Sequence, residues 1–389
     1  MLAHHKDDQA ETVLLRLNAG YTGTGLAGIQ REAGIPECAG IYGVHASGGP
    51  PPRSPSSSLK SSDCGGEIDM RVATGGVELV RPLLQLSKVS LIKLCYENGV
   101  SWVEDATNRD VTLTTRNAIR SILKNKRLPL ALNKPALLNL ANAKEEYNDT
   151  TKRLADEAFG QVRASINYGT GTLTFTVSES ISNMLSQAIA LRLLKRLANC
   201  VSPQDNISKA QLASACEQVF PDLTATEGAP QGSKDPDSRV FTVADVLWQG
   251  RTSDNDPTTW HWHLSRQRPS KPFPVCAWSS EPHATTTAQP YWTWQLFDGR
   301  YWVRARHAKK RDVSLQLLRP ETLEVTRKFK HRVLMLDKLL HEHAPGLLRF
   351  TLPAFVDQKT GQVLALPTLG WRAGNDLGLK WEIQYKQVI

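Results

Sequence analysis

The first element that the pattern of apolar and polar positions predicts is a helix near the start of the chain. Over residues 5–29 apolar side chains recur at the three- and four-residue spacing of an amphipathic helix, which then gives way to a glycine-rich loop. The stripe consists of Ala10, Val13, Leu14 and Leu17. The run Asp8-Gln9-Ala10-Glu11 has the form of a capping box, so it predicts that the helix begins at Asp8.

Further elements follow at shorter intervals as far as residue 222. The pattern predicts a strand over 77–80, a helix over 88–98 that Gly99 stops, a short strand over 100–103 and a capped helix over 108–126. Three more helices are predicted near 135–160, 181–199 and 208–220. Helices and short strands in this order are typical of an α/β region followed by a helical region.

Beyond residue 238 the pattern changes to the two-residue alternation of strands. YWTWQLFDGRYWVRAR alternates on both sides of Asp298-Gly299, which predicts a hairpin, and LPAFVDQKTGQVLALP predicts a second one around residues 359–361. A helix is expected at about 327–343. The final third of the chain is therefore expected to be β-rich.

Two segments have the composition of loops or linkers. Residues 47–62 are rich in Pro, Ser and Gly, and we expect all of 31–76 to be a disordered insertion because it offers too little apolar surface to bury. Residues 224–238 resemble a linker. The predicted organisation is a partial α/β domain over 1–125, a helical domain over 126–222 and a β-rich domain over 223–389.

Composition narrows the class of protein. The 389 residues include no apolar run of 18, and the first helix carries acids where a signal peptide has an apolar core. The six cysteines form no C-x-x-C pair, which argues against zinc, iron–sulfur and disulfide frameworks and fits a reducing compartment. The net charge of +9 suggests a polyanionic partner. We expect a soluble intracellular protein without a membrane partner, cytoplasmic or mitochondrial.

The acidic stretch AHHKDDQAET has two interpretations from its residues alone. Its carboxylates suit the positive end of a helix dipole, and this structural explanation is the favoured one in isolation. They also converge on one side of a helix, since Asp8 and Glu11 are three residues apart and Asp7 and Glu11 four apart. The same residues are therefore compatible with half of an active site.

Two blocks of sequence together resemble the tRNA(Ile)-lysidine synthase family of PP-loop ATPases, in the adenine-nucleotide α-hydrolase-like superfamily. The first block is AHHKDDQAETVLLRL followed by GLAGI, and the second is RPLL followed by EDATNRDVTLTTRNAIRSIL. Their combination, in which Asp105, Asn108 and Asp110 precede an Arg-Asn-x-x-Arg motif, is far more specific than either block alone. The resemblance implies an α/β fold with a partial PP-loop domain over 1–125, and it implies that the helical domain over 126–222 contacts tRNA.

One feature of that family is missing from the sequence. The family opens with a Ser-Gly-Gly-x-Asp-Ser loop that holds the ATP phosphates, whereas here Ser47-Gly48-Gly49 is followed by three prolines and lies after the acidic motif. We therefore expect either a truncated gene model or a fragment without its nucleotide half, and weak binding of ATP by this chain.

The resemblance implies a ligation that joins free L-lysine to C2 of the wobble cytidine of tRNA(Ile), with ATP converted to AMP and diphosphate and with Mg²⁺ as the metal. By resemblance, Asp8 and Glu11 are assigned to Mg²⁺ and to the lysine ammonium, His5 to positioning or proton transfer and Asp7 to the nucleotide. Hard oxygen ligands suit Mg²⁺, and an amine with an ordinary pKa of about 10.4 must be deprotonated to attack.

Basic residues of the second block are expected to contact the anionic substrates. The resemblance assigns Arg116, Asn117 and Arg120 to contacts with nucleotide or tRNA. The alternative is that they belong to a solvated, charged helix face that has no binding role. Further tRNA or lysine contacts are expected at Arg81, Lys88, Lys124 and Arg127. Asp105, Asn108 and Asp110 are expected to build the turn before the helix.

The basic stretch 300–332, with Tyr301, Trp302 and Phe329 interleaved, is an additional candidate for tRNA contact, against an ordinary core. Two other functions stay open. One is a degenerate, non-catalytic tRNA-binding protein, and the other is a PP-loop tRNA thiolase, which the lack of C-x-x-C disfavours. The resemblance leaves a homodimer open.

Overall fold

The computed structural model describes most of the chain. The described residues are 1–35, 37–38, 41–42, 70–73, 78–105, 107, 110–124, 128–223, 238–270, 273–279, 289–328, 333–374 and 378–386. They form two compact units: unit 1 comprises Met1–Ile35 and Glu78–Leu154, and unit 2 comprises Pro36–Val77 and Ala155–Ile389. The mixed α/β class is confirmed, and the three-domain division, whose bounds differ from these units, stays a prediction.

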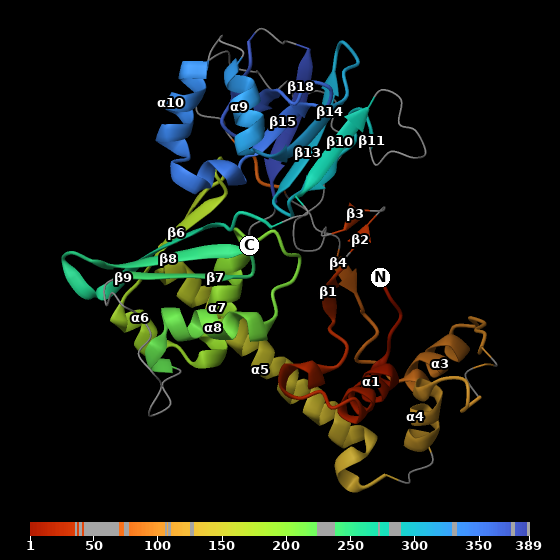
Figure 1. The fold of residues 1–389 in the computed structure, drawn as a ribbon. Helices are drawn as coiled ribbons and strands as arrows, with labels where there is room; N and C mark the ends of the chain where they lie inside the picture. Colours follow the sequence, from red (N-terminus) through yellow and green to blue (C-terminus); the bar gives the residue numbers. More distant parts are fainter. Residues whose placement is uncertain are drawn as a thin grey trace. The chain divides into compact units, whose positions relative to one another are not determined.

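Unit 1 is built around the first helix, α1 (Lys6–Asn18). Its other elements are η1 (Gly23–Ala27), β1 (Glu32–Gly34), β4 (Glu78–Val80), α3 (Lys88–Glu97), α4 (Thr115–Lys124), η3 (Leu130–Leu132) and the start of α5 (Lys134–Gln161), which continues into unit 2. α1 lies against the first half of α5 (Figure 1), and Val13 of α1 packs in a small core with Leu137 and Ala141 of α5. β1 pairs antiparallel with β4. The apolar stripe of the first helix is thus buried as its spacing predicts.

Several expectations for unit 1 need correction. The helix begins at Lys6 with His5 as its N-cap, and the capping box joins His5 to Asp8, because the side chain of Glu11 is engaged elsewhere. No regular strand forms over 100–103, and α4 begins at residue 115 rather than 108. The predicted strand over 77–80 and the helix ending before Gly99 are confirmed by β4 and α3.

The expected disordered insertion falls mainly outside the described residues, including all of 47–62. Its described parts include a strand, since Glu32–Gly34 forms β1. At its other end Met70 and Ala73 are buried, and Val72 bridges to Tyr385 in unit 2. Disorder is therefore not the state of these parts.

The first part of unit 2 is an antiparallel sheet with one face covered by helices. The strand order is β5 (Ser165–Asn167), β6 (Thr172–Val177), β9 (Asp256–Arg266), β8 (Val246–Ser253) and β7 (Ser238–Val243). The helices are α6 (Glu179–Met184), α7 (Gln187–Asn199) and α8 (Lys209–Val219), followed by η4 (Pro221–Leu223). They lie on one side of the sheet (Figure 1), and the core between them contains Leu173, Trp248, Trp262 and Leu193.

This sheet was only partly foreseen. The three helical segments expected near 135–160, 181–199 and 208–220 are present, although the second is divided into α6 and α7. Strands β5 and β6 lie inside the region that was expected to be wholly helical, and β6 pairs with β9. The alternation of TLTFTV is buried at Leu173, Phe175 and Val177, which is the strand pattern that the sequence reading passed over.

The second part of unit 2 holds two further sheets. One has the order β11 (Gln289–Pro290), β10 (Val275–Ser279), β14 (Val313–Leu317), β15 (Pro353–Asp357), β16 (Val363–Leu366) and β17 (Trp371–Arg372). The other has the order β12 (Gln295–Phe297), β13 (Tyr301–His307) and β18 (Leu379–Tyr385). The remaining elements are β2 (Glu37–Cys38), β3 (Ile41–Tyr42), α9 (Pro320–Lys328), α10 (Val333–His343) and η5 (Gly346–Thr351). Both predicted hairpins are confirmed, and the single late helix is in fact α9 and α10.

The aromatic side chains of unit 2 are mostly interior. Trp248, Trp262, Trp278 and Trp302 are among the largest fully buried side chains, and Tyr301 is buried with them. Tyr301 and Trp302 therefore pack in the core and present no stacking surface, while Phe329 lies outside the described residues. Over the described ranges, no helix has both the length and the apolar character needed to cross a bilayer.

Candidate active site

The acidic start of α1 is fixed by its own cap. The amide of His5 donates to Asp8 Oδ2 at 2.9 Å, and the amide of Asp8 donates to His5 Nδ1 at 3.4 Å. His5 Nδ1 also lies 3.3 Å from Asp8 Oδ2 and 3.7 Å from Asp7 Oδ2. His5 thus positions the turn that carries Asp7 and Asp8.

Two arginines of α4 bind the carboxylates of α1. Arg116 Nε donates to Glu11 Oε2 at 3.0 Å, and Arg116 Nη2 donates to Asp8 Oδ1 at 3.1 Å. Arg120 donates to Glu11 through Nε, at 2.7 Å to Oε1, and through Nη2, at 3.0 Å to Oε2. These four side chains, which we call the arginine–carboxylate cluster, join two sequence blocks separated by more than 100 residues.

Burial divides the cluster into an inner and an outer part. The Glu11 side chain is only 4% exposed and the Asp8 side chain 14%, whereas Arg116 is 37% exposed. The hydrogen bonds that Arg120 donates to Glu11 raise the pKa of Arg120, against the lowering effect of its burial. Glu11 therefore acts as an internal anchor for two cations, and Arg116 and Asp8 form the accessible edge.

Asp7 holds a separate set of contacts. It accepts a hydrogen bond from the amide of Lys88 at 2.8 Å and forms an ion pair with Lys134. Burial alone would raise the pKa of Asp7, but the hydrogen bonds from Lys134 and Lys88 outweigh it and hold this pKa below its ordinary value. The side chain of Lys88 pairs with Glu104 at 2.8 Å. These contacts tie α1 to the starts of α3 and α5.

Asn117 supports the loop that precedes α4. Its amide donates to the carbonyls of Thr107 and Asp110 at 3.0 and 2.9 Å, and its residue is 8% exposed. Asp105 and Asp110 each cap a short turn through the threonine two residues later. Asp105 and Asp110 thus build the turn expected of them, and Asn108 lies outside the described residues.

The other residues that were expected in the site do not belong to the arginine–carboxylate cluster. Arg81 donates to His4 Nδ1 at 3.2 Å and to the carbonyl of Gln30 at 2.8 Å, so it joins the strand β4 to the start of the chain. Lys124 is exposed at the end of α4. Arg127 lies outside the described residues. Among the predicted site residues that the structure describes, Asp8, Glu11, Arg116 and Arg120 form one cluster through side-chain hydrogen bonds, and His5 joins it through the helix cap.

The sequence reading missed two side chains that shape the neighbouring glycine-rich loop. Gln9, which is buried, donates to the carbonyl of Ala27 at 2.9 Å and accepts from the amide of Ile29 at 2.6 Å. Arg16 donates to the carbonyls of Gly25 and Gly28 at 2.6 Å. The repeated glycines before Ile29 were the available signal, because a loop rich in backbone polar groups needs side-chain partners.

Replacing Gly28 with Ala is expected to destabilise unit 1 by about 1–3 kcal/mol. Gly28 has φ +72°, and an added Cβ would lie 2.5 Å from Gln9 Oε1. Gly20 is a matched control, since it has φ +76° but open space around a Cβ. Urea unfolding should show a greater loss for Gly28→Ala than for Gly20→Ala, and equal losses would contradict the contact with Gln9.

Of the two carboxylates in the cluster, only one is placed to bind a metal ion. Both oxygens of Glu11 and both oxygens of Asp8 accept hydrogen bonds, and the described part of the chain has no group of three His, Cys, Asp or Glu side chains arranged for a metal. Mg²⁺ on a nucleotide commonly takes one or two protein carboxylates and completes its shell with phosphates and water. Asp8 fits such a role because its carboxylate lies at the accessible edge, whereas buried Glu11 does not.

Comparisons with known proteins agree with the two blocks of this site. Residues 1–126 match the PP-loop domain family. The chain is 26% identical over 384 residues to a probable tRNA(Ile)-lysidine synthase of Schizosaccharomyces pombe, covering 96% of this chain and 69% of that protein. It is 30% identical over 122 residues to the tRNA(Ile)-lysidine synthase of Bacillus subtilis, covering 31% of this chain and 18% of that protein.

The match to a relative from Methylobacterium nodulans extends further along the chain than the match to the Bacillus subtilis protein. This tRNA(Ile)-lysidine synthase is 28% identical over 196 residues, covering half of the present chain and 45% of its own length. The chain thus spans about two thirds of its yeast relative and less than half of these bacterial ones. Both blocks of the candidate site lie within the matched PP-loop domain.

Proposed function

We propose that this chain, which carries a PP-loop domain and is related to tRNA(Ile)-lysidine synthases, forms the lysine-ligating part of such an enzyme. The reaction joins the ε-amine of free lysine to C2 of the wobble cytidine of tRNA(Ile), with ATP converted to AMP and diphosphate. The single observation that supports it best is the arginine–carboxylate cluster. It unites the two sequence blocks that carry the resemblance, and it does so at the start of a helix, where anionic groups are favoured.

The cluster holds cations that can stabilise the negative phosphate groups of this reaction. ATP activates the C2 oxygen by adenylation, which places negative phosphate groups beside the reacting base. Arg116 is the most exposed cation of the cluster, and its guanidinium is held in place by Asp8 and Glu11. A guanidinium fixed in advance stabilises a phosphate at little reorganisation cost, so we assign Arg116 to the nucleotide or to the tRNA phosphate.

Asp8 is assigned to the lysine ammonium and to Mg²⁺. Mg²⁺, when bound, would neutralise phosphate charge and favour departure of the leaving group. Asp8 would hold the ammonium of lysine near C2, and its carboxylate is a base within reach of a proton that the amine must lose before attack. His5 fixes the position of Asp8 through the cap. We assign Glu11, contrary to the expectation from resemblance, to positioning Arg116 and Arg120.

A non-catalytic tRNA-binding protein is the second candidate. It is favoured by one observation, namely that all four carboxylate oxygens of Asp8 and Glu11 already accept hydrogen bonds. In such a protein the same cluster would serve only to join α1 to α4, and the surfaces for tRNA would remain.

Lysidine formation can be measured directly. The chain, and the same chain extended by any coding sequence that lies upstream in frame, are incubated with a tRNA(Ile) transcript, ATP and isotope-labelled lysine. Mass spectrometry of the anticodon nucleoside is expected to show lysidine with at least the extended protein. Binding of tRNA(Ile) by both proteins without lysidine in either would favour the non-catalytic candidate and overturn our proposal.

A further inference from the structure

The five-stranded sheet β5-β6-β9-β8-β7 of unit 2 carries its described helices on one face (Figure 1), and its strands present a second set of side chains on the opposite face. Side chains on its strands alternate, so Phe175 of β6, Trp248 of β8 and Trp262 of β9 point into the core against the helices. Their neighbours in sequence point to the other face. That face is polar over the three central strands, where Thr174, Gln249 and His261 alternate with the core residues.

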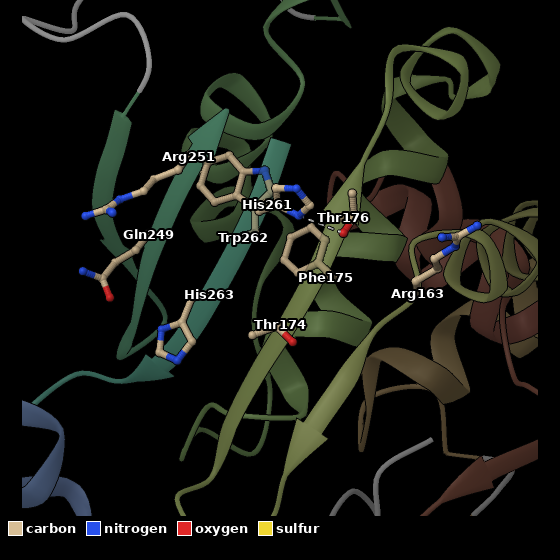
Figure 2. A pocket seen from close by; sticks show the side chains of 9 residues that line it. All are labelled: Arg163, Thr174, Phe175, Thr176, Gln249, Arg251, His261, Trp262 and His263. Carbon is tan, nitrogen blue, oxygen red and sulfur yellow. Dashed lines mark hydrogen bonds between the residues drawn. The ribbon is translucent and has the colours of Figure 1, made fainter. Parts of the chain in front are cut away.

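A hollow of about 470 Å³ lies over these three strands. In Figure 2, Arg251 and Gln249 of β8 lie on one side of the group and Arg163 on the other, with His261 and Thr176 between them. The lining residues are Arg163, Thr174, Phe175, Thr176, Gln249, Arg251, His261, Trp262 and His263. No carboxylate is among the described residues that line it, so the hollow combines cationic groups with neutral polar ones.

Strand register arranges these side chains in two rows. Arg251 is paired with His261, and His261 with Thr176, while Gln249, His263 and Thr174 form the parallel row. Thr176 Oγ1 lies 3.3 Å from His261 Nδ1. Neighbouring strands are about 4.8 Å apart, so Arg251 and Thr176 lie about 10 Å apart across β9.

Arg163 extends the first row beyond β6. It follows Val162, whose carbonyl accepts a hydrogen bond from the Thr176 amide at 2.9 Å, and its φ of +47° marks the chain reversal there. The two guanidinium groups therefore flank the hollow from opposite sides. This separation is too great for a single phosphate and suits two phosphates of one strand that have more than one nucleotide between them.

The groups between the arginines are suited to a ribose rather than to a second phosphate. Burial lowers the pKa of His263, so this imidazole is neutral at pH 7 and offers one donor and one acceptor. Thr174, Thr176 and Gln249 add hydroxyl and amide groups of the same dual kind. A 2′-hydroxyl both donates and accepts hydrogen bonds, and RNA-binding proteins use contacts of this kind together with phosphate contacts.

We infer that this face of the sheet binds the sugar–phosphate backbone of an RNA strand, with Arg163 and Arg251 on separate phosphates and the two-row centre on the ribose groups between them. The inference rests on the proposed function, in which tRNA is the substrate, and assigns that substrate a contact surface in unit 2. An acidic protein would match the two arginines but not the neutral hydrogen-bonding centre. RNA is therefore the occupant to which we commit.

The test uses the full chain with Arg163→Gln and Arg251→Gln, singly and together, and fluorescence anisotropy with a tRNA(Ile) transcript at 50–200 mM KCl. The double variant is expected to bind roughly tenfold more weakly at the lowest salt. Its log–log salt slope should fall by about 1.5–2, or close to one per phosphate contact. Lys359→Gln, an exposed charge change in the turn between β15 and β16, is the matched control and should alter affinity less than about twofold.

Additional binding experiments distinguish RNA from other anionic ligands of this face. A poly(U) strand of about 20 nucleotides tests the RNA surface independently of lysidine chemistry. Loss of poly(U) affinity in the double variant supports the inference even if no lysidine forms. An unchanged affinity and salt slope for both RNAs would overturn it, with folding verified by circular dichroism. It would also be overturned if the double variant lost affinity for orthophosphate or for polyglutamate by the same factor as for RNA.

Discussion

Replacing Asp8 with Ala is expected to abolish lysidine formation, lowering kcat/KM by about 10²–10⁴-fold in the protein that shows the activity. Asp8 is the accessible carboxylate of the arginine–carboxylate cluster, and its loss removes the group that holds the lysine ammonium and receives its proton. Affinity for tRNA should change less than about twofold, because a carboxylate repels RNA phosphates. The measurements are mass spectrometry of the anticodon nucleoside and tRNA binding by anisotropy.

Glu97→Gln provides the control for this loss. It removes one carboxylate from an exposed pair with Lys93 in the same unit, so lysidine yield should stay unchanged. A normal yield from a folded Asp8→Ala protein would contradict the catalytic assignment, and the acidic stretch would then be only the capped start of a helix.

Replacing Glu11 tests whether this residue positions the two arginines or takes part in the chemical step. Glu11→Gln keeps the shape of the side chain but removes the charge that holds Arg116 and Arg120, so both arginines lose their fixed orientation. If Arg116 serves ATP, this variant should raise KM for ATP. If Arg116 serves tRNA, the same variant should weaken tRNA binding. An Arg116→Ala variant should show the same pattern, and combining the two changes should add little because both break one unit.

The candidate site illustrates what the sequence alone can predict. Glu11 and Arg116 are separated by 105 positions, so no periodicity relates them, and only the joint resemblance of the two blocks brought them into one hypothesis. Their direct contact was not expected. Instead, Glu11 was read as a partner in a local capping box. The long-range arginines removed it from that role, and His5 took the position of the cap.

The fold was predictable where local chemistry decides it. The hairpin at Asp298-Gly299 follows from turn residues that accept positive φ, and both residues have it. Strands β5 and β6 were missed because they are short and lie between helices, and β9, the strand that joins β6 to the rest of the sheet, is about 90 residues away. Pairing over such distances leaves no local signal beyond alternation.

Charged residues in the interior of unit 2 were the least predictable feature. Arg266, Asp298 and Arg300 form a buried network: Arg266 donates to Asp298 at 3.1–3.3 Å and Arg300 Nε donates to Asp298 Oδ2 at 2.9 Å. Arg300 Nη2 also donates to the carbonyl of Thr351 at 2.8 Å. Burial would lower the pKa of Arg300, but the charge of Asp298 raises it. In sequence these residues look like the polar positions of exposed strands.

Replacing Asp298 with Ala is therefore expected to destabilise unit 2 by about 3–5 kcal/mol, since it leaves the buried guanidinium of Arg300 without its counter-charge and leaves Arg266 only the more distant carboxylate of Asp245 at 3.6 Å. The Asp298 side chain is 2% exposed, and those of Arg266 and Arg300 are 6% and 0% exposed. Urea unfolding followed by tryptophan fluorescence reports on this unit, where Trp248, Trp262, Trp278 and Trp302 are buried.

Two control variants assign the cause of that loss. Asp298→Asn keeps a residue that tolerates the φ of +47° and retains one acceptor oxygen, so it should lose the charge effect without the backbone strain that Ala adds. Asp254→Ala removes an exposed carboxylate near the turn between β8 and β9 and should change the free energy of unfolding by less than about 0.5 kcal/mol. If Asp298→Ala falls within about 1 kcal/mol of Asp254→Ala, the buried arginines are compensated by something other than Asp298. A large loss in both Asp298 variants identifies its charge as the element that allows two arginines to remain inside the unit.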